Sequence, residues 1–98
     1  MMEREIERTD WSRFFEAFTL EHDHWRVHVD GENESLSLAG ITCRDGKLVV
    51  HLGADVSHHR VITIDAARVA VEQTGGADEG VAITSTDGHT TRLRFVRP

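Results

Sequence analysis

The sequence predicts an α+β fold, in which an N-terminal helix packs on a strongly bent antiparallel sheet or a partly open small barrel of six or seven strands. One run of aromatic residues near the start has the spacing of a helix face. Later segments alternate apolar and polar residues, as strands do. Short turns rich in glycine and aspartate separate those segments, which is typical of an antiparallel meander. Such a sheet has to bend or be covered at its edges, and the helix offers one apolar face that can cover it.

The predicted helix begins after Thr9 or Asp10, either of which can accept a hydrogen bond from an unpaired amide of the first turn. Positions i, i+3, i+4 and i+7 that follow are all aromatic and form one helical face: Trp11, Phe14, Phe15 and Phe18. His22 lies four residues after Phe18 and is expected to extend this face as a partly buried histidine. We expect the aromatic face to pack on the sheet.

Period-two alternation predicts strands over 24–30, 35–38 with an extension to 41, 48–52, 60–64, 69–74, 81–85 and 91–96. Asp45-Gly46 and Asp87-Gly88 are hairpin signals between such runs. The other connections are interpreted as turns or loops: 30–34 (DGENE), 53–59 (GADVSHH), 65–68 (DAAR) and 75–80 (GGADEG). Residues 1–8 are a polar lead-in that either frays or adds an edge strand.

Length and composition limit the class of protein. The 98 residues are expected to form a single domain, 1–98. With 17 acidic and 11 basic residues the net charge is −6, which argues against nucleic-acid binding. No apolar run reaches the ~20 residues of a spanning helix, so no membrane association is expected. Cys43 is the lone cysteine and the charged N-terminus is unlike a signal peptide, which together predict a cytoplasmic protein.

Four segments carry a resemblance to a known family: REIERTDWSRFFEAF at the start, LAGITC leading to HLG, RVAVEQTGGADEGVAI, and TSTDGHTTRLRF. In their order and spacing they resemble an uncharacterised, mostly bacterial family of small proteins catalogued as a domain of unknown function. The chain looks shorter than that family between Asp30 and Ser35 and at its C-terminus. The resemblance covers most of the chain, but it implies no activity, and no catalytic residue follows from it.

Two groups of histidines raise the question of a metal site. His51, Asp55, His58 and His59 are of ligand types that suit zinc, nickel or copper, and a loop can bring them together. Adjacent strand residues point to opposite faces, so only one of His58 and His59 is expected to reach an ion. In the second group, His24 and His28 share a strand face but their Cα atoms lie ~13 Å apart, so the polar face of a strand explains them better.

Candidate catalytic residues have structural interpretations that fit better. Cys43 with a neighbouring histidine could form a nucleophile–base pair, but it sits at a predicted strand end as a small apolar residue. Ser57-His58 lacks the glycines of a hydrolase elbow. The carboxylate pairs Glu32/Glu34 and Asp78/Glu79 fall in predicted turns. No enzymatic activity is therefore expected.

The sequence predicts a small non-catalytic binding or self-associating domain, which uses a sheet edge or a helix flank to contact a protein partner or to form a homodimer. The outward-facing Arg60, Arg92 and Arg94 support a binding role. The alternative is a small metal- or ligand-dependent protein in which the histidine cluster at 51–59 holds a transition metal such as zinc. If the histidine cluster does not bind a metal, no cofactor is expected.

Overall fold

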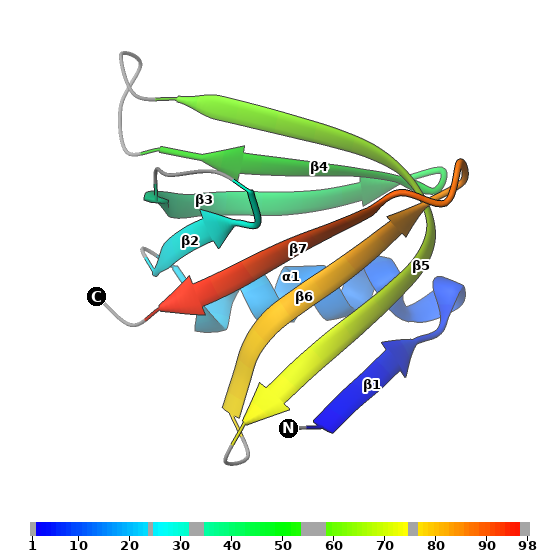
Figure 1. The fold of residues 1–98 in the computed structure, drawn as a ribbon, viewed down its shortest axis with the longest axis horizontal. Coiled ribbons are helices and arrows are strands. Elements are labelled where there is room, and N and C mark those ends of the chain that lie inside the picture. Colours follow the sequence, from blue (N-terminus) through cyan, green and yellow to red (C-terminus); the bar gives the residue numbers. More distant parts are fainter. Residues whose placement is uncertain (1, 24, 32–34, 54–58, 75–76, 97–98) are drawn as a thin grey trace.

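A computed structural model describes residues 2–23, 25–31, 35–53, 59–74 and 77–96 of the chain (Figure 1). One helix, one short 3-10 turn and the strands follow each other in the order β1 (Met2–Ile6), η1 (Arg8–Asp10), α1 (Trp11–Glu21), β2 (Arg26–Val29), β3 (Ser35–Arg44), β4 (Lys47–Leu52), β5 (Arg60–Thr74), β6 (Ala77–Ser85) and β7 (Thr90–Val96). No helix in these ranges is long and apolar enough to cross a membrane.

The strands form one antiparallel sheet in the order β1-β5-β4-β3-β2-β7-β6, and a further pairing of β5 with β6 closes β2–β7 into a small barrel. β1 is the extra strand and pairs with the second half of β5. α1 lies along β3 and covers one side of the barrel (Figure 1). The predicted α+β fold, a helix on a bent antiparallel sheet or small barrel, is therefore confirmed. Residues 2–6, for which fraying or an edge strand was expected, form the edge strand.

β5 is a single strand of 15 residues, whereas the sequence predicted two strands separated by a turn over 65–68. That turn prediction is wrong. At its N-terminal half β5 pairs with β4, and from Ala66 onward it pairs with β6. The change of partner coincides with a β-bulge between Ala66 and Arg68, which bends the strand without interrupting it. A bulge and a turn both interrupt the alternation of apolar residues, so the pattern alone did not separate them.

The predicted aromatic face of α1 packs into the core of the barrel. Trp11, Phe15 and Phe18 are buried, and the Trp11 indole Nε1–H donates to the Ile6 carbonyl at 2.9 Å. The Phe18 and Phe95 rings meet edge to face with centroids 4.8 Å apart. The helix thus ties β1 to β7, which are far apart in the sequence.

α1 lacks the side-chain cap that the sequence predicted, so that prediction is wrong. Asp10 precedes the helix as expected, but its side chain makes no capping hydrogen bond. Its backbone is helical, with φ −102° and ψ −5°, because a 3-10 turn over Arg8–Asp10 leads into the helix. A capping residue needs extended backbone to aim its oxygen at the first amides, and Asp10 lacks it.

The hairpin predictions are confirmed at both Asp-Gly pairs. Asp45 and Gly46 adopt positive φ of 52° and 80°, which is the backbone of a tight two-residue hairpin between β3 and β4. At the β6–β7 turn the Asp87 carboxylate accepts from the Ser85 hydroxyl and from the His89 N–H, and these bonds lower the pKa of Asp87. The predicted loop over 75–80 is too long, since Ala77 already belongs to β6 and pairs with Thr74.

Removing a buried ring of α1 should destabilise the fold. Phe15 is 0% exposed, so Phe15→Ala is expected to lower the free energy of unfolding by about 3–5 kcal/mol through lost burial and the cavity left behind. Urea denaturation followed by circular dichroism measures this change.

Leu20→Ala is the matched control, because Leu20 lies on the same helix and is 78% exposed. Its effect should stay within about 0.5 kcal/mol. Equal effects of the two substitutions would contradict the orientation of α1.

Candidate functional site

The first half of β5 presents an open strand edge. Residues 60–65 pair with β4 on one side, and in the described part of the chain no strand pairs with their other side. The Asp65 carbonyl faces this other side, where it accepts the Thr86 N–H at 2.9 Å. Backbone groups alternate in direction along a strand, so the N–H and C=O of Val61 and Thr63 face the open side too. Figure 1 shows this half of β5 as the outermost strand of its part of the barrel.

The side chains beside this edge differ between the two faces of the sheet. Val61, 46% exposed, and Thr63 lie on the outer face. Ile62 and Ile64 lie on the inner face and line a cleft of about 370 Å³ between β5 and the β6–β7 turn. The edge is therefore bordered by apolar groups on both faces.

Sequence reasoning missed this edge, because it divided β5 into two strands. The alternation of apolar residues breaks between Ile64 and Val69, but Asp65 and Arg68 are polar and suit a turn as well as a bulge. No local signal therefore separated the two interpretations.

His51 and His59 from the predicted metal cluster are brought together. They lie on the outer face of the β4–β5 ribbon, with their rings nearly parallel at 9° and their centroids 6.1 Å apart. His59 is thus the member of the His58/His59 pair that shares a face with His51. Asp55 and His58 lie outside the described residues. Within the described ranges, no three His, Cys, Asp or Glu side chains form a group that could hold a metal.

The histidines nearer the N-terminus are placed apart from each other. His22, 5% exposed, is buried among aromatic rings, with Phe18 stacked on it at 3.9 Å. Its Nδ1 pairs with the Phe18 carbonyl at 2.9 Å. His22 thus extends the helix face as expected, but it is buried where a partly buried side chain was predicted. His28 is half-buried on β2, and His24 lies outside the described residues.

Cys43 is half-buried on β3 and packs against the core. Burial raises the pKa of its thiol, and this effect outweighs the nearby Arg8 guanidinium, which lowers it. A nucleophilic cysteine needs the opposite shift, toward thiolate at neutral pH. The geometry therefore favours the structural interpretation of Cys43.

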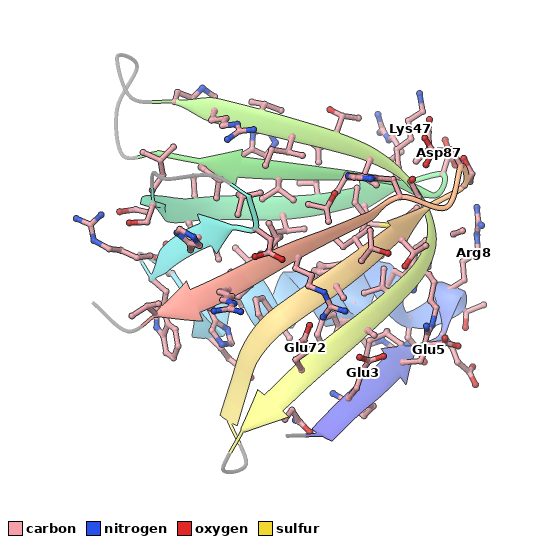
Figure 2. All side chains as sticks on the ribbon, viewed as in Figure 1. Glu3, Glu5, Arg8, Lys47, Glu72 and Asp87 are labelled. Carbon is pink, nitrogen blue, oxygen red and sulfur yellow. The ribbon has the colours of Figure 1, made fainter. Side chains whose placement is uncertain are left out.

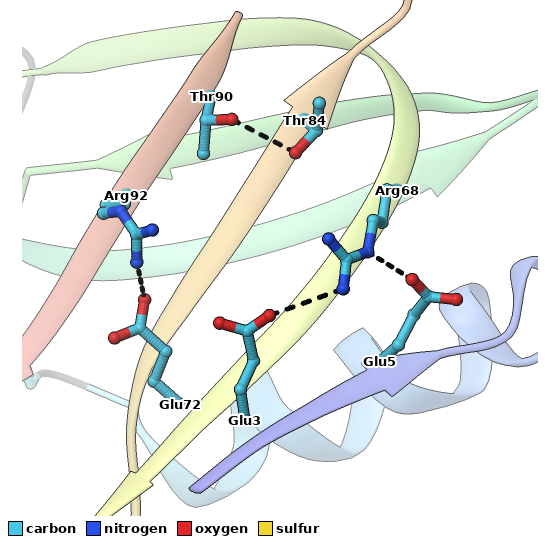
Figure 3. Close-up of polar contacts among 7 residues, drawn as sticks. All are labelled: Glu3, Glu5, Arg68, Glu72, Thr84, Thr90 and Arg92. Carbon is cyan, nitrogen blue, oxygen red and sulfur yellow. Dashed lines mark hydrogen bonds and ion pairs between the residues drawn. The ribbon is translucent and has the colours of Figure 1, made fainter. Parts of the chain in front are cut away.

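The outer face of the sheet carries ion pairs that join β1 to β5 and, across β6, β7 to β5 (Figure 3). Arg92 pairs with Glu72, and Arg68 pairs with both Glu3 and Glu5. Arg92, expected to face a partner, is thus engaged by the sheet itself. The Glu32/Glu34 pair, and the side chains of Asp78 and Glu79, lie outside what the structure describes.

A groove of about 430 Å³ runs between α1 and β3. It is lined by Ser12, Glu16, Thr19 and Leu20 of the helix and by residues 40–43 of the strand. Here β3 has run past its partner β2, but α1 covers the strand edge, since the Ile41 N–H donates to the Thr19 hydroxyl at 3.2 Å. The edge of β3 beside this groove is therefore covered by the helix, whereas the edge of β5 is open.

The raised pKa of Cys43 can be tested by alkylation. The rate of reaction with iodoacetamide, followed between about pH 7 and pH 10, reports the thiolate fraction. Its midpoint should lie at higher pH in the native protein than in the same protein unfolded in urea, because folding buries the thiol. A native midpoint at or below the unfolded one would show that Arg8 dominates and would restore Cys43 as a candidate nucleophile.

Comparison of the chain with protein-family models, curated proteins and solved structures finds no match.

Proposed function

We propose that this protein is a small non-catalytic domain that associates with a second copy of itself by pairing the open edges of β5. The observation that carries the proposal is the set of backbone groups of Val61 and Thr63 that face away from β4 without a partner among the described residues. An open row of N–H and C=O groups is a template for another strand. A homodimer with two-fold symmetry would use this edge on both copies.

The open segment favours one register. Its outward-facing backbone groups are those of Val61 and Thr63, since the carbonyl of Asp65 is already bonded to Thr86. Ile62 is its midpoint, so a two-fold axis at Ile62 aligns the whole open segment with itself. Val61 of each copy then faces Thr63 of the other, which satisfies the exposed backbone groups of both.

This register is also compatible with the side chains. Val61 and Thr63 are both β-branched, and such residues pack well across antiparallel strands. The half-buried Ile62 side chains of the two copies meet at the axis. Pairing would cover the exposed Val61 while bringing no like charges into opposition within residues 61–63.

The other strand edges are less suitable. β1 carries Glu3, Arg4 and Glu5, and two copies paired about Arg4 would oppose Arg4 to Arg4 and Glu3 to Glu5. Like charges directly opposite each other destabilise strand pairing. The edge of β3 is covered by Thr19 of α1.

The association should be weak. Two residue pairs that each exchange two bonds give about four intermolecular hydrogen bonds. Each contributes roughly 1 kcal/mol net, and the interface is small. We therefore expect a dissociation constant between about 1 μM and 1 mM.

Because Cys43 is the single cysteine and is half-buried, we also propose a reducing, cytoplasmic setting, in which this thiol stays reduced.

Thr63→Pro should abolish the dimer. Proline lacks an N–H and its ring obstructs an approaching strand, yet the Thr63 N–H faces away from β4, so the β4–β5 ladder loses no bond. Sedimentation equilibrium from about 10 μM to 1 mM should show a monomer–dimer equilibrium for the native protein and a monomer for the variant.

Thr63→Val is the matched control, because it keeps both the N–H and the side-chain shape and should dimerise. Circular dichroism of each variant confirms that it is folded. A native protein that stays monomeric at 1 mM, or a folded Thr63→Pro variant that dimerises like the native protein, would contradict the proposal.

A further inference from the structure

We infer that His51 and His59 of one copy and Asp65 of a second copy form a transition-metal site that strengthens the pairing of the β5 edges. The inference rests on the proposed function, because Asp65 of the second copy reaches the histidines only in that assembly.

The two histidines lie close enough to each other to form a half-site. His51 faces Val61 across the β4–β5 ladder, and His59 lies two residues before Val61, so both side chains project from the same outer face. Metal–nitrogen bonds of ~2.0–2.1 Å at a tetrahedral ion place two imidazole centroids roughly 5–5.5 Å apart. The observed centroid separation is 6.1 Å, with ring planes 9° apart. Small rotations of two partly exposed side chains would direct one nitrogen of each ring at a common ion.

One copy supplies too few ligands for a tight site. Zinc in proteins takes four ligands, and at least three usually come from the protein. Among the described residues no third His, Cys, Asp or Glu joins the two histidines. The half-site therefore needs a further ligand from elsewhere, and an anionic oxygen suits it.

Asp65 of the second copy meets that need in the proposed register. The axis at Ile62 sets Arg60 against Ile64, so residue 59 of one copy lies beside residue 65 of the other. Residues 59 and 65 share the outer face of the ribbon with His51, so the Asp65 carboxylate of the second copy projects on the same side of the sheet as the two imidazoles. Carboxylate oxygen binds zinc at ~2.0–2.2 Å.

Asp65 is free enough to act as a ligand. Its carboxylate lies 3.9 Å from the Lys47 ammonium, and both side chains are 63% exposed. An exposed ion pair at that distance contributes little and is easily exchanged for a metal bond. Figure 2 shows Lys47 and Asp87 at the same end of the barrel.

The two-fold axis creates two such sites per dimer, hence one ion per chain. An ion that binds the dimer more tightly than the monomer shifts the monomer–dimer equilibrium by mass action. Zinc should therefore lower the dissociation constant of the dimer by at least about tenfold, as expected for a ligand at concentrations well above its own dissociation constant.

Sedimentation equilibrium with either excess EDTA or zinc sulfate tests the inference on the untagged full chain. The readout is the dimer dissociation constant in EDTA divided by that in zinc. A substitution that also weakens strand pairing raises both constants, so it leaves this ratio interpretable. His51→Asn, His59→Asn and Asp65→Asn should each bring this ratio close to one. His28→Asn, a half-buried histidine on β2, is the matched control and should keep the ratio of the native protein.

The outcomes separate the inference from the proposed function. A dimer that forms in EDTA and is unaffected by zinc would overturn the metal site and leave the edge pairing intact. Zinc bound one per chain by a monomer, or a native response to zinc in Asp65→Asn, would overturn the bridging role of Asp65. Absence of any dimer with EDTA and with zinc would contradict the pairing itself.

Discussion

The bend of β5 is the constraint on which the rest of the structure depends. One strand of 15 residues takes part in two differently directed regions of sheet, and it changes its neighbours between Asp65 and Ala66. Two hydrogen bonds fix this point: the Ala66 N–H donates to the Gly46 carbonyl, and the Asp65 carbonyl accepts from Thr86. They attach the β3–β4 and β6–β7 turns to the same position, so that the barrel closes around the bend.

The bend also determines where the sheet is covered and where it is open. Beyond it, β5 is flanked by both β1 and β6, and α1 follows β1 across the barrel to lie on β3. The aromatic face of α1 fills the interior there, while Thr19 takes up a free amide of β3. Before the bend, β5 pairs with β4 alone among the described strands. The open edge of β5 and its neighbouring histidine pair are therefore consequences of the way the barrel closes.

Local patterns predicted most of the fold, and non-local contacts explain what they missed. The spacing of Trp11, Phe15 and Phe18 is a property of neighbouring residues, and so is the backbone of Asp45-Gly46, which is why the helix and the hairpin were predictable. The bulge at Ala66 depends on two separate strands that meet β5, which no local window contains. For the same reason the sequence grouped His51 with His59 correctly but could not indicate the open edge beside them.

Amide hydrogen exchange of β5, followed by NMR at about 50 μM and about 1 mM, tests most directly whether this edge is open and self-complementary. The amides of Val61 and Thr63 should exchange faster in the dilute sample than in the concentrated one, because the monomer fraction falls as the concentration rises. Those of Ile62 and Ile64, which face β4, should be protected in both. Exchange of Val61 and Thr63 at a rate independent of concentration would contradict the account.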